Sequence, residues 1–437
     1  MKQFFNARKI AVIGASRDKN KVGHAILHNL LKNPKLIVYP VNPKAKEILN
    51  RHAYPSILDV PNNIDLAIIV VPAKLVPEII KEIAKKKIKN VIIISAGFSE
   101  TGNTKLENKI RKIAKENNIS ILGPNCLGIL SPKKKLNATF YEKIPEQGEI
   151  AFITQSGAVG VAMLDRAIKD NLGFSGFVSI GNQADIDINQ ALDYFSKDKD
   201  TKVICLYIES LKAGKGKEFI DICKKSKKKI IVIKAGKTEI GKKAASSHTA
   251  SLASDERIYS GAFKQAGIIE VDSLEELFTS AFIITKHKNL GNKAVIITNA
   301  GGLGVLAADA CSKNKIKVVD IPHKISKKLK KVLPDTAPKS DPLDIIGDAQ
   351  ADRYKKVFNI LDNKSFFDFF IILLTPQQMT EPLKTAIAIT HLEKPCFVSF
   401  IGGKQLNKAI KLLNHYKIPH FEDVYDLAKT IGKIIKK

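Results

Sequence analysis

The sequence predicts an α/β protein built from three successive units, each with a parallel sheet. Short apolar segments alternate with amphipathic segments of helical length along the 437 residues, which is typical of parallel α/β architecture. Turns of small residues follow many of the apolar segments, where an open parallel sheet places its ligand. The start of the second unit is also repeated at the start of the third, which indicates a duplicated structural unit.

Residues 1–127 are predicted to form the first domain. The expected strands are Lys9–Ile13, Leu36–Val41, Leu66–Val71, Asn90–Ser95 and Ser120–Gly123. Four of them end in the turn sequences GASRD, NPK, PAK and SAGFSE. Because the carboxyl ends of parallel strands share one edge, these turns predict a ligand crevice there.

The first turn, VIGASRDKNKVG, resembles a dinucleotide-binding loop but lacks the G-x-G-x-x-G pattern. The second strand ends at Asn42 and supplies no acidic residue for a ribose hydroxyl. An NAD site therefore lacks both of its markers. What remains is a helix N-terminus suited to phosphates, with Arg17 and Lys44 placed to add positive charge. We expect a nucleotide-like ligand without a nicotinamide.

Residues 128–148 lack periodicity and are predicted to be a linker, and residues 149–288 to form the second domain. Four polar side chains follow strands of this domain, and the shared edge of a parallel sheet should bring them together. They are Ser156, Asn182, Glu209 and His248. An alternative role for Glu209 is capping of a helix N-terminus.

His248 is the one imidazole in a loop of small and hydroxylated residues, Ala244–Ser254. Such a loop cannot build a core and can lie close to other backbone. This composition suits a histidine that moves toward a partner and is modified there. A surface histidine in a flexible connection is the simpler alternative, since loop histidines are common.

Residues 289–437 are predicted to form the third domain, whose opening repeats that of the second. Thr154-Gln155-Ser156-Gly157 parallels Thr298-Asn299-Ala300-Gly301. In each copy a strand turns through small residues into a helix whose first amides are free of bulky side chains. Two such helix ends facing one point would hold a phosphate without arginine. Asp344 and Asp348 follow in the same domain, and loop capping explains them better than a metal pair, since no third ligand accompanies them.

The amino-acid composition limits the classes of function that this chain can have. The net charge of +28 admits a nucleic-acid-binding protein, but the excess is mostly lysine and carries no interleaved aromatic residues, which favours a solvated basic surface that steers anions. The five scattered cysteines are not spaced as metal ligands and indicate reduced thiols in the cytoplasm. No apolar run approaches a membrane span, and we expect neither a signal peptide nor a metal site.

With these motifs assembled, the chain resembles the α subunit of ADP-forming acyl-CoA synthetases (acetate–CoA ligase, ADP-forming), relatives of succinyl-CoA synthetase. The resemblance covers essentially the whole chain. The motifs that carry it are SSHTASLAS around His248, TQSGAVG, GNQADID, GPNCLG at Gly123–Gly128, NAGGLGV and PLDIIGDA. It implies a Rossmann-like CoA-binding domain followed by two flavodoxin-like domains.

The resemblance also implies roles for individual residues. CoA would be bound by Gly14, Ala15, Ser16, Arg17, Lys44, Ser95, Ala96, Gly97 and Asn125. His248 would carry the phosphoryl group, with Glu209 orienting its ring. Two turns, Ser156-Gly157 and Gly301-Gly302, would hold the phosphoryl group. The reaction implied is acyl-CoA, ADP and inorganic phosphate to acid, CoA and ATP, through an acyl phosphate and a phosphohistidine.

Two departures from the family pattern shape this hypothesis. The segment 158–163 has no tyrosine where succinyl-CoA synthetase has one, so a short monocarboxylate or an aryl acid fits better than a dicarboxylate. The chain has no ATP-grasp domain, so an ATP-grasp β subunit would supply ADP and Mg²⁺, in an α2β2 assembly. The alternatives are a non-catalytic CoA-binding regulator of the same fold and, from another class, a basic nucleic-acid-binding protein.

Overall fold

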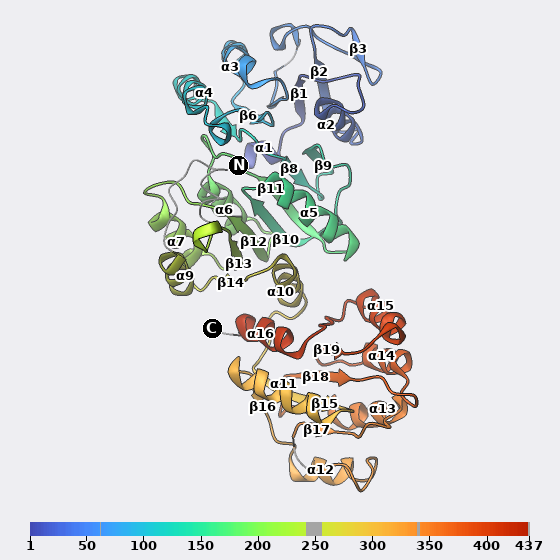
Figure 1. The fold of residues 1–437 in the computed structure, drawn as a ribbon. Helices are drawn as coiled ribbons and strands as arrows, with labels where there is room; N and C mark the ends of the chain where they lie inside the picture. The colour runs from blue at the N-terminus through green and yellow to red at the C-terminus, as the bar shows by residue number, and fades with distance from the viewer. Residues whose placement is uncertain (62, 242–255, 339–340, 436–437) are drawn as a thin grey trace. The chain divides into compact units, whose positions relative to one another are not determined.

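The computed structural model describes all residues except 62, 242–255, 339–340 and 436–437. The chain divides into two compact units, residues 1–277 and residues 278–437. The first unit contains two large sheets and the second contains one (Figure 1). The helix α10 (Leu274–Lys286) contains the boundary between the units.

The first sheet is parallel and has the strand order β2-β1-β5-β6-β7. Its strands are almost wholly buried apolar runs, as expected for a parallel sheet covered on both faces. They are β1 (Lys9–Ile13), β2 (Ile37–Val41), β5 (Leu66–Ile69), β6 (Asn90–Ile93) and β7 (Ser120–Leu122). The five strands predicted from the sequence are therefore confirmed, each within two residues at its ends.

The described part of residues 1–127 also contains four α-helices, of which α1 packs on β8 and on α6 of the second sheet. In α3 the buried residues Val76, Ile80 and Ile83 recur at helical spacing. At the start of α4 the side-chain oxygen of Asn103 accepts a hydrogen bond from the Leu106 amide at 3.4 Å, and so caps the helix. The helices are α1 (Lys2–Phe5), α2 (Val22–Leu31), α3 (Val76–Lys85) and α4 (Thr104–Glu116); the shorter elements are β3 (Glu47–Ile48), β4 (Arg51–His52), η1 (Ile57–Asp59), η2 (Ala73–Leu75) and η3 (Ser99–Thr101).

The second sheet has the order β14-β13-β12-β10-β11-β8-β9. Its parallel part, from β14 to β11, follows the same winding as the first sheet, while β8 pairs antiparallel with β11. The strands are β8 (Gly128–Ser131), β9 (Leu136–Thr139), β10 (Gln147–Thr154), β11 (Phe174–Ser179), β12 (Val203–Ile208), β13 (Lys229–Lys234) and β14 (Ile269–Glu270). The helices are α5 (Gly157–Lys169), α6 (Ile188–Lys197), α7 (Gly216–Lys225) and α9 (Glu256–Gln265).

The predicted linker at residues 128–148 is wrong. Strands β8 and β9 form a buried antiparallel hairpin that extends the second sheet, and β10 begins at Gln147. The two hairpin strands have four residues each and are buried on both faces; β8 shows no apolar–polar alternation, and the alternation of β9 is too short to mark a strand in sequence. The hairpin therefore belongs to the packed body of the first unit.

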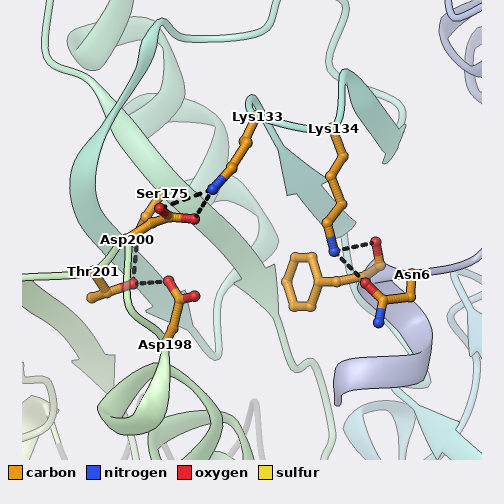
Figure 2. A network of polar contacts seen from close by, with 8 residues as sticks. Asn6, Lys133, Lys134, Ser175, Asp198, Asp200 and Thr201 are labelled. Carbon is orange, nitrogen blue, oxygen red and sulfur yellow. Dashed lines mark hydrogen bonds and ion pairs between the residues drawn. The ribbon is translucent and has the colours of Figure 1, made fainter.

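The turn of this hairpin also fixes neighbouring parts of the first unit (Figure 2). The Lys133 ammonium lies 2.7 Å from a carboxylate oxygen of Asp200, in the loop before β12. In the same loop the Thr201 hydroxyl donates to Asp198 at 2.6 Å. The Lys134 ammonium donates to the Phe5 carbonyl oxygen at 3.2 Å, at the end of α1. The turn thus contacts both the N-terminal helix and the second sheet.

The first two sheets pack against one continuous hydrophobic core. This core contains Ile10 and Leu27 from the first predicted domain and Ile153 and Phe195 from the second, all at most 1% exposed. The segments predicted as two domains are therefore packed together as one compact unit.

A set of backbone hydrogen bonds joins the two sheets at their carboxyl edges. The loop 123–127 follows β7, and the turn 180–186 follows β11. The Asn182 and Ala184 amides donate to the carbonyl oxygens of Pro124 and Gly123, both at 2.9 Å. The close approach requires glycine at position 181, where φ is +58° and an added Cβ would lie 2.1 Å from the Pro124 oxygen.

The second unit is built on the order β16-β15-β18-β19, with β17 also paired to β15. All pairs among these five strands are parallel. A single parallel bridge between Val398 and His420 extends the sheet beyond β19. The elements are β15 (Lys293–Thr298), β16 (Lys317–Val318), β17 (Leu343–Asp344), β18 (Phe369–Leu374), β19 (Cys396–Phe400), α11 (Gly301–Lys313), α12 (His323–Leu329), α13 (Ala351–Leu361), α14 (Pro382–Thr390), η4 (Lys404–Leu406), α15 (Asn407–His415) and α16 (Val424–Ile435). Among the helices that the structure describes, none is long and apolar enough to span a membrane.

Replacing Gly181 by alanine should destabilise the first unit more than replacing Gly214 does. Gly214 also has positive φ, +77°, but no atom lies within 4 Å of its added Cβ. We expect Gly214→Ala to cost about 1 kcal/mol from backbone strain. Gly181→Ala should cost about 1–3 kcal/mol more, because the methyl group displaces the Pro124 carbonyl. Calorimetric unfolding of both variants tests this, and equal losses would contradict the role of the junction.

A candidate ligand cavity at the joined edges of two sheets

A cavity of about 1180 Å³ lies where the carboxyl edges of the first two sheets meet. Both sheets contribute to its wall, from the ends of β1, β2, β5 and β6 and from the ends of β10, β11 and β12. Ten of the residues predicted to form the site line it: Gly14, Ala15, Ser16, Lys44, Ser95, Ala96, Asn125, Ser156, Gly157 and Glu209. Residues predicted for two different roles are thus brought to one space.

The turn after β1 is closely packed and leaves helix amides open to the cavity. Gly14 has φ of +91°, and a Cβ there would lie 2.5 Å from the Val70 carbonyl oxygen. A Cβ on Gly23, in the first turn of α2, would lie 2.1 Å from the Gly14 oxygen. No side chain caps the start of α2. Its amide donors and positive helix end are therefore open to the cavity and suit a phosphate.

Asn42 shapes the neighbouring edge after β2. Its side-chain amide donates to the Ala15 carbonyl at 2.7 Å, and its side-chain oxygen accepts the Lys44 amide at 2.8 Å. The residue that takes the place of an acidic ribose ligand thus holds two turns of the cavity wall together.

Two basic residues, Lys21 and Lys44, are present among the described lining residues. Lys21 precedes α2 and was missed in the sequence, where it is one of two lysines in the loop. Arg17 and Gly97, both predicted as CoA ligands, do not line the cavity. Arg17 is exposed, and the Gly97 amide donates to a Glu100 carboxylate oxygen at 2.6 Å.

The second edge is organised by Gln155, which joins the ends of β10 and β12. Its side-chain nitrogen donates to the Ser210 carbonyl at 2.8 Å. Its side-chain oxygen accepts hydrogen bonds from the Ser210 amide, at 3.0 Å, and from the Glu209 amide. Glu209 is partly buried at the cavity, directly after β12. Gln155 therefore fixes the backbone that carries Glu209.

A buried ammonium supports the same strand end. Lys234 is 7% exposed, and its Nζ donates to the Glu209 carbonyl at 2.8 Å and lies 4.8 Å from the ring centre of Tyr259. Burial lowers the pKa of Lys234, and the nearby charge of Glu209 acts in the opposite direction. Nothing in the sequence pattern marks Lys234, because it ends an ordinary strand.

Asn182 also lines the cavity, so Ser156, Asn182 and Glu209 are brought to the same edge as predicted. Its side-chain nitrogen donates to Glu107 at 2.9 Å and to the Ser99 hydroxyl at 3.1 Å, and its oxygen accepts from Asn125 at 3.3 Å. Asn182 therefore ties the first sheet to the second. His248, the fourth predicted member, lies outside the described residues.

The N-terminus of α5 closes this edge. The Thr154 hydroxyl donates to the Ser156 carbonyl at 2.8 Å and accepts the Ser156 amide at 3.0 Å. The Ser156 hydroxyl accepts the Val159 amide at 3.3 Å and so caps the helix. Gly157 and the exposed Ala158 then face the cavity.

The duplicated turn in the second unit has the same internal geometry. The Thr298 hydroxyl donates to the Ala300 carbonyl at 3.0 Å, and the Asn299 side chain donates to the Thr375 carbonyl at 2.8 Å. Here Gly301 is exposed and Ala300 provides no cap. A Cβ on Gly301 would lie 2.8 Å from a carboxylate oxygen of Asp344, so this helix start already faces a negative charge.

Asp344 and Asp348 act as loop-stabilising residues. Asp344 accepts the Ile346 amide at 2.8 Å. Asp348 pairs with Arg353 at 2.5 Å, and this hydrogen bond holds the pKa of Asp348 below its usual range. The described residues contain no group of three side chains that could hold a metal ion.

Cys126 lies in the cavity wall, but its thiol is not set up as a nucleophile. Burial raises its pKa to about 12, and its sulfur lies 3.4 Å from the Ile93 carbonyl oxygen. A thiol with this pKa stays protonated at neutral pH. Cys126 therefore packs in the wall as an uncharged thiol.

Comparison with known proteins assigns these regions to characterised domain families. Residues 8–132 match a CoA binding domain, residues 147–284 a succinyl-CoA ligase like flavodoxin domain, and residues 294–432 a ligase-CoA domain. Over 446 aligned residues the chain is 38% identical to the α subunit of ADP-forming acetate–CoA ligase II from Pyrococcus furiosus, covering 99% of this chain and 97% of that one. The chain belongs to the ADP-forming acetate–CoA ligase family.

Other members of the family are longer. The chain is 46% identical to an ADP-forming acetate–CoA ligase from Methanocaldococcus jannaschii and spans 62% of its length. It spans 63% of a relative of the same description from Archaeoglobus fulgidus, at 41% identity. The structure is similar to a dinucleotide-forming acetyl-coenzyme A synthetase 1 from Candidatus Korarchaeum cryptofilum solved with phosphate and ADP, with a TM-score of 0.91, 36% identity and coverage of 98% and 94% of the two chains. These matches confirm the predicted fold class.

Cys126 should resist alkylation in the folded protein. Its thiolate forms only as the pH approaches about 12, so iodoacetamide at pH 8 should leave it unmodified. Denaturant should restore the ordinary reactivity of the thiol, which has an unperturbed pKa of about 8.5. Peptide mass spectrometry of the two samples provides the measurement. Rapid labelling of Cys126 in the folded state would show that the thiol is accessible and activated.

Proposed function

We propose that this chain is the α subunit of an ADP-forming acyl-CoA synthetase, with acetyl-CoA or a related monocarboxylic thioester as substrate. The complete reaction converts acyl-CoA, ADP and inorganic phosphate to the acid, CoA and ATP. The observation that carries the proposal is the shared cavity, which joins phosphate-binding features after β1 and β2 to Glu209 and the N-terminus of α5. A CoA thioester and a phosphate can meet in such a space.

CoA binding rests on the first sheet. The open amides at the start of α2 and the turn Gly14-Ala15-Ser16 suit the diphosphate, and the ammonium groups of Lys21 and Lys44 add positive charge. Ser95, Ala96 and Asn125 line the same space. We retain Arg17 and Gly97 as CoA contacts implied by the family motif, although they do not line the cavity.

The chemistry rests on the second sheet. Phosphate oxygen attacks the thioester carbonyl, the carbon–sulfur bond breaks, and CoA leaves as the thiol once a proton is supplied. An unprotonated imidazole nitrogen of His248 then attacks the acyl phosphate at phosphorus, and the acid leaves as a carboxylate. Glu209 would accept a hydrogen bond from the other ring nitrogen, fixing its tautomer and stabilising the positive charge that develops.

The N-terminus of α5 provides the electrostatic support. Amides near Ser156 and Gly157 offset negative charge on the phosphoryl group as it is transferred. We propose this turn as the principal phosphate holder. Gly301 and Gly302 remain our proposed second turn because the duplicated geometry supports it, while the carboxylate of Asp344 opposes an anion at the first amide.

The nucleotide is assigned to a partner. We propose that an ATP-grasp β subunit binds ADP with Mg²⁺, receives the phosphoryl group from His248 and assembles with this chain as α2β2. The α-subunit name of the Pyrococcus furiosus relative and the greater length of the other relatives support a separate partner or segment. The free, buried cysteines fit the proposed cytoplasmic location.

Incubation with radiolabelled phosphate, acetyl-CoA and Mg²⁺ should label the chain on His248. His248→Ala should abolish the label, while His415→Ala, a change at an exposed histidine outside the cavity lining, should keep it. Glu209→Gln should slow labelling about 10²-fold or more, since the amide cannot stabilise the charged ring. A wild-type chain that binds CoA and takes no label would indicate the non-catalytic regulator instead.

Gln155→Leu and Asn299→Leu form a matched pair in the duplicated turns. Each removes a side chain that bonds both backbone groups of the neighbouring strand end, so each should cost about 1–3 kcal/mol of unfolding free energy. Only Gln155→Leu should slow phosphate labelling, because it frees the backbone of Glu209. Equal labelling rates in the two variants would remove the Gln155 bridge from the mechanism.

A further inference from the structure

Phe140 is an exposed aromatic side chain in the wall of the cavity. It follows β9 directly, is 38% exposed and lines the cavity together with Ala158 and Val161 of α5. Val22, at the start of α2, is also 38% exposed and lines the same cavity. Exposed apolar side chains gathered in a cavity are typical of a ligand contact rather than of a core.

The backbone on both sides of Phe140 is held rigidly. The side-chain nitrogen of Asn29 donates to the carbonyl oxygens of Thr139 and Tyr141, at 2.9 and 3.0 Å. Asn29 is only 2% exposed. The Tyr141 carbonyl also accepts from Asn137 at 2.8 Å. These bonds fix the backbone before and after Phe140, whose aromatic ring is left open to the cavity, which is the arrangement of a preorganised contact.

The same segment is attached to the helix that faces it. The Tyr141 hydroxyl donates to a carboxylate oxygen of Asp165 at 2.5 Å. Asp165 lies on α5, one turn after Val161 and two turns after Ala158, so the hydrogen bond sets the position of Phe140 relative to these apolar residues. The wall therefore consists of two elements joined by a specific polar contact.

The position of this wall in the cavity indicates which part of a bound thioester it would contact. Ala158 directly follows Gly157, the residue at which the proposed function puts the phosphate that attacks the thioester. The carbonyl carbon must lie at that end of the cavity, and the group attached to it must extend to the adjacent wall. The anionic parts of CoA have Lys44, Lys21 and the α2 amides as partners elsewhere in the lining.

We propose that Phe140 and Ala158 form the acyl-group pocket and determine which acyl group is accepted. The pocket takes an uncharged apolar acyl chain, branched or aromatic, whose surface packs on the Phe140 ring. This inference rests on the proposed function, because it takes the thioester to be the ligand. It goes further by assigning specificity to a residue outside the CoA and phosphoryl sites.

Calorimetric titration of the full chain with CoA, acetyl-CoA, isobutyryl-CoA and phenylacetyl-CoA tests the assignment. In the wild type, we expect phenylacetyl-CoA to bind more tightly than CoA. Phe140→Ala should weaken phenylacetyl-CoA about 10-fold, with a smaller effect on isobutyryl-CoA, and should change the Kd of CoA less than about twofold. Because Phe140 is exposed, the variant should fold normally, which its unfolding temperature will verify.

Two further variants sharpen the result. Ala158→Phe adds bulk at an exposed lining position and should weaken phenylacetyl-CoA while leaving CoA unchanged. Leu58→Ala, at a side chain that is 42% exposed and does not line the cavity, should alter no affinity. If Phe140→Ala weakens CoA and all thioesters equally, the ring contacts the CoA portion and the proposal is wrong. Unchanged affinities would also overturn it, whereas a wild type that binds no CoA would defeat the proposed function itself.

Discussion

The carboxyl edges of the first two sheets are held together by a short series of backbone hydrogen bonds. The turn after β11 donates amides to carbonyl oxygens in the loop after β7, at a distance that only glycine at position 181 permits. In an open α/β sheet, the ligand site lies outside the carboxyl ends of the strands. When two such edges are joined, two ligand-binding edges become one cavity. The arrangement of the proposed site residues that line this cavity depends on the junction.

The second constraint is a repeated strand-to-helix turn whose side-chain amide forms hydrogen bonds to the backbone at the end of the neighbouring strand. Gln155 in the first unit and Asn299 in the second make equivalent bonds to strand ends that follow β12 and β18. The surroundings then differ. The first copy has a serine cap and lies beside Glu209, whereas the second has no cap and faces Asp344. The same backbone geometry therefore offers an anion two different electrostatic environments.

The sequence alone predicted the parallel strands well, because each is a continuous apolar run that ends in a turn of small residues. It also predicted that Ser156, Asn182 and Glu209 would share an edge, since strand order does not affect that conclusion. The β8–β9 hairpin was missed because its two strands have only four residues each, too few for an alternation of apolar and polar side chains to mark them. The lining residues Lys21 and Phe140 and the buried Lys234 were missed because their roles come from contacts distant in sequence, and no local spacing records them.

Hydrogen–deuterium exchange of the full chain with saturating CoA tests the central claim, that one cavity joins both sheets. We expect slower exchange at amides of the turn after β1, around Ser16, and also at the start of α5, around Ala158, with the same dependence on CoA concentration. Slower exchange confined to the first sheet, with the α5 amides unchanged, would contradict it.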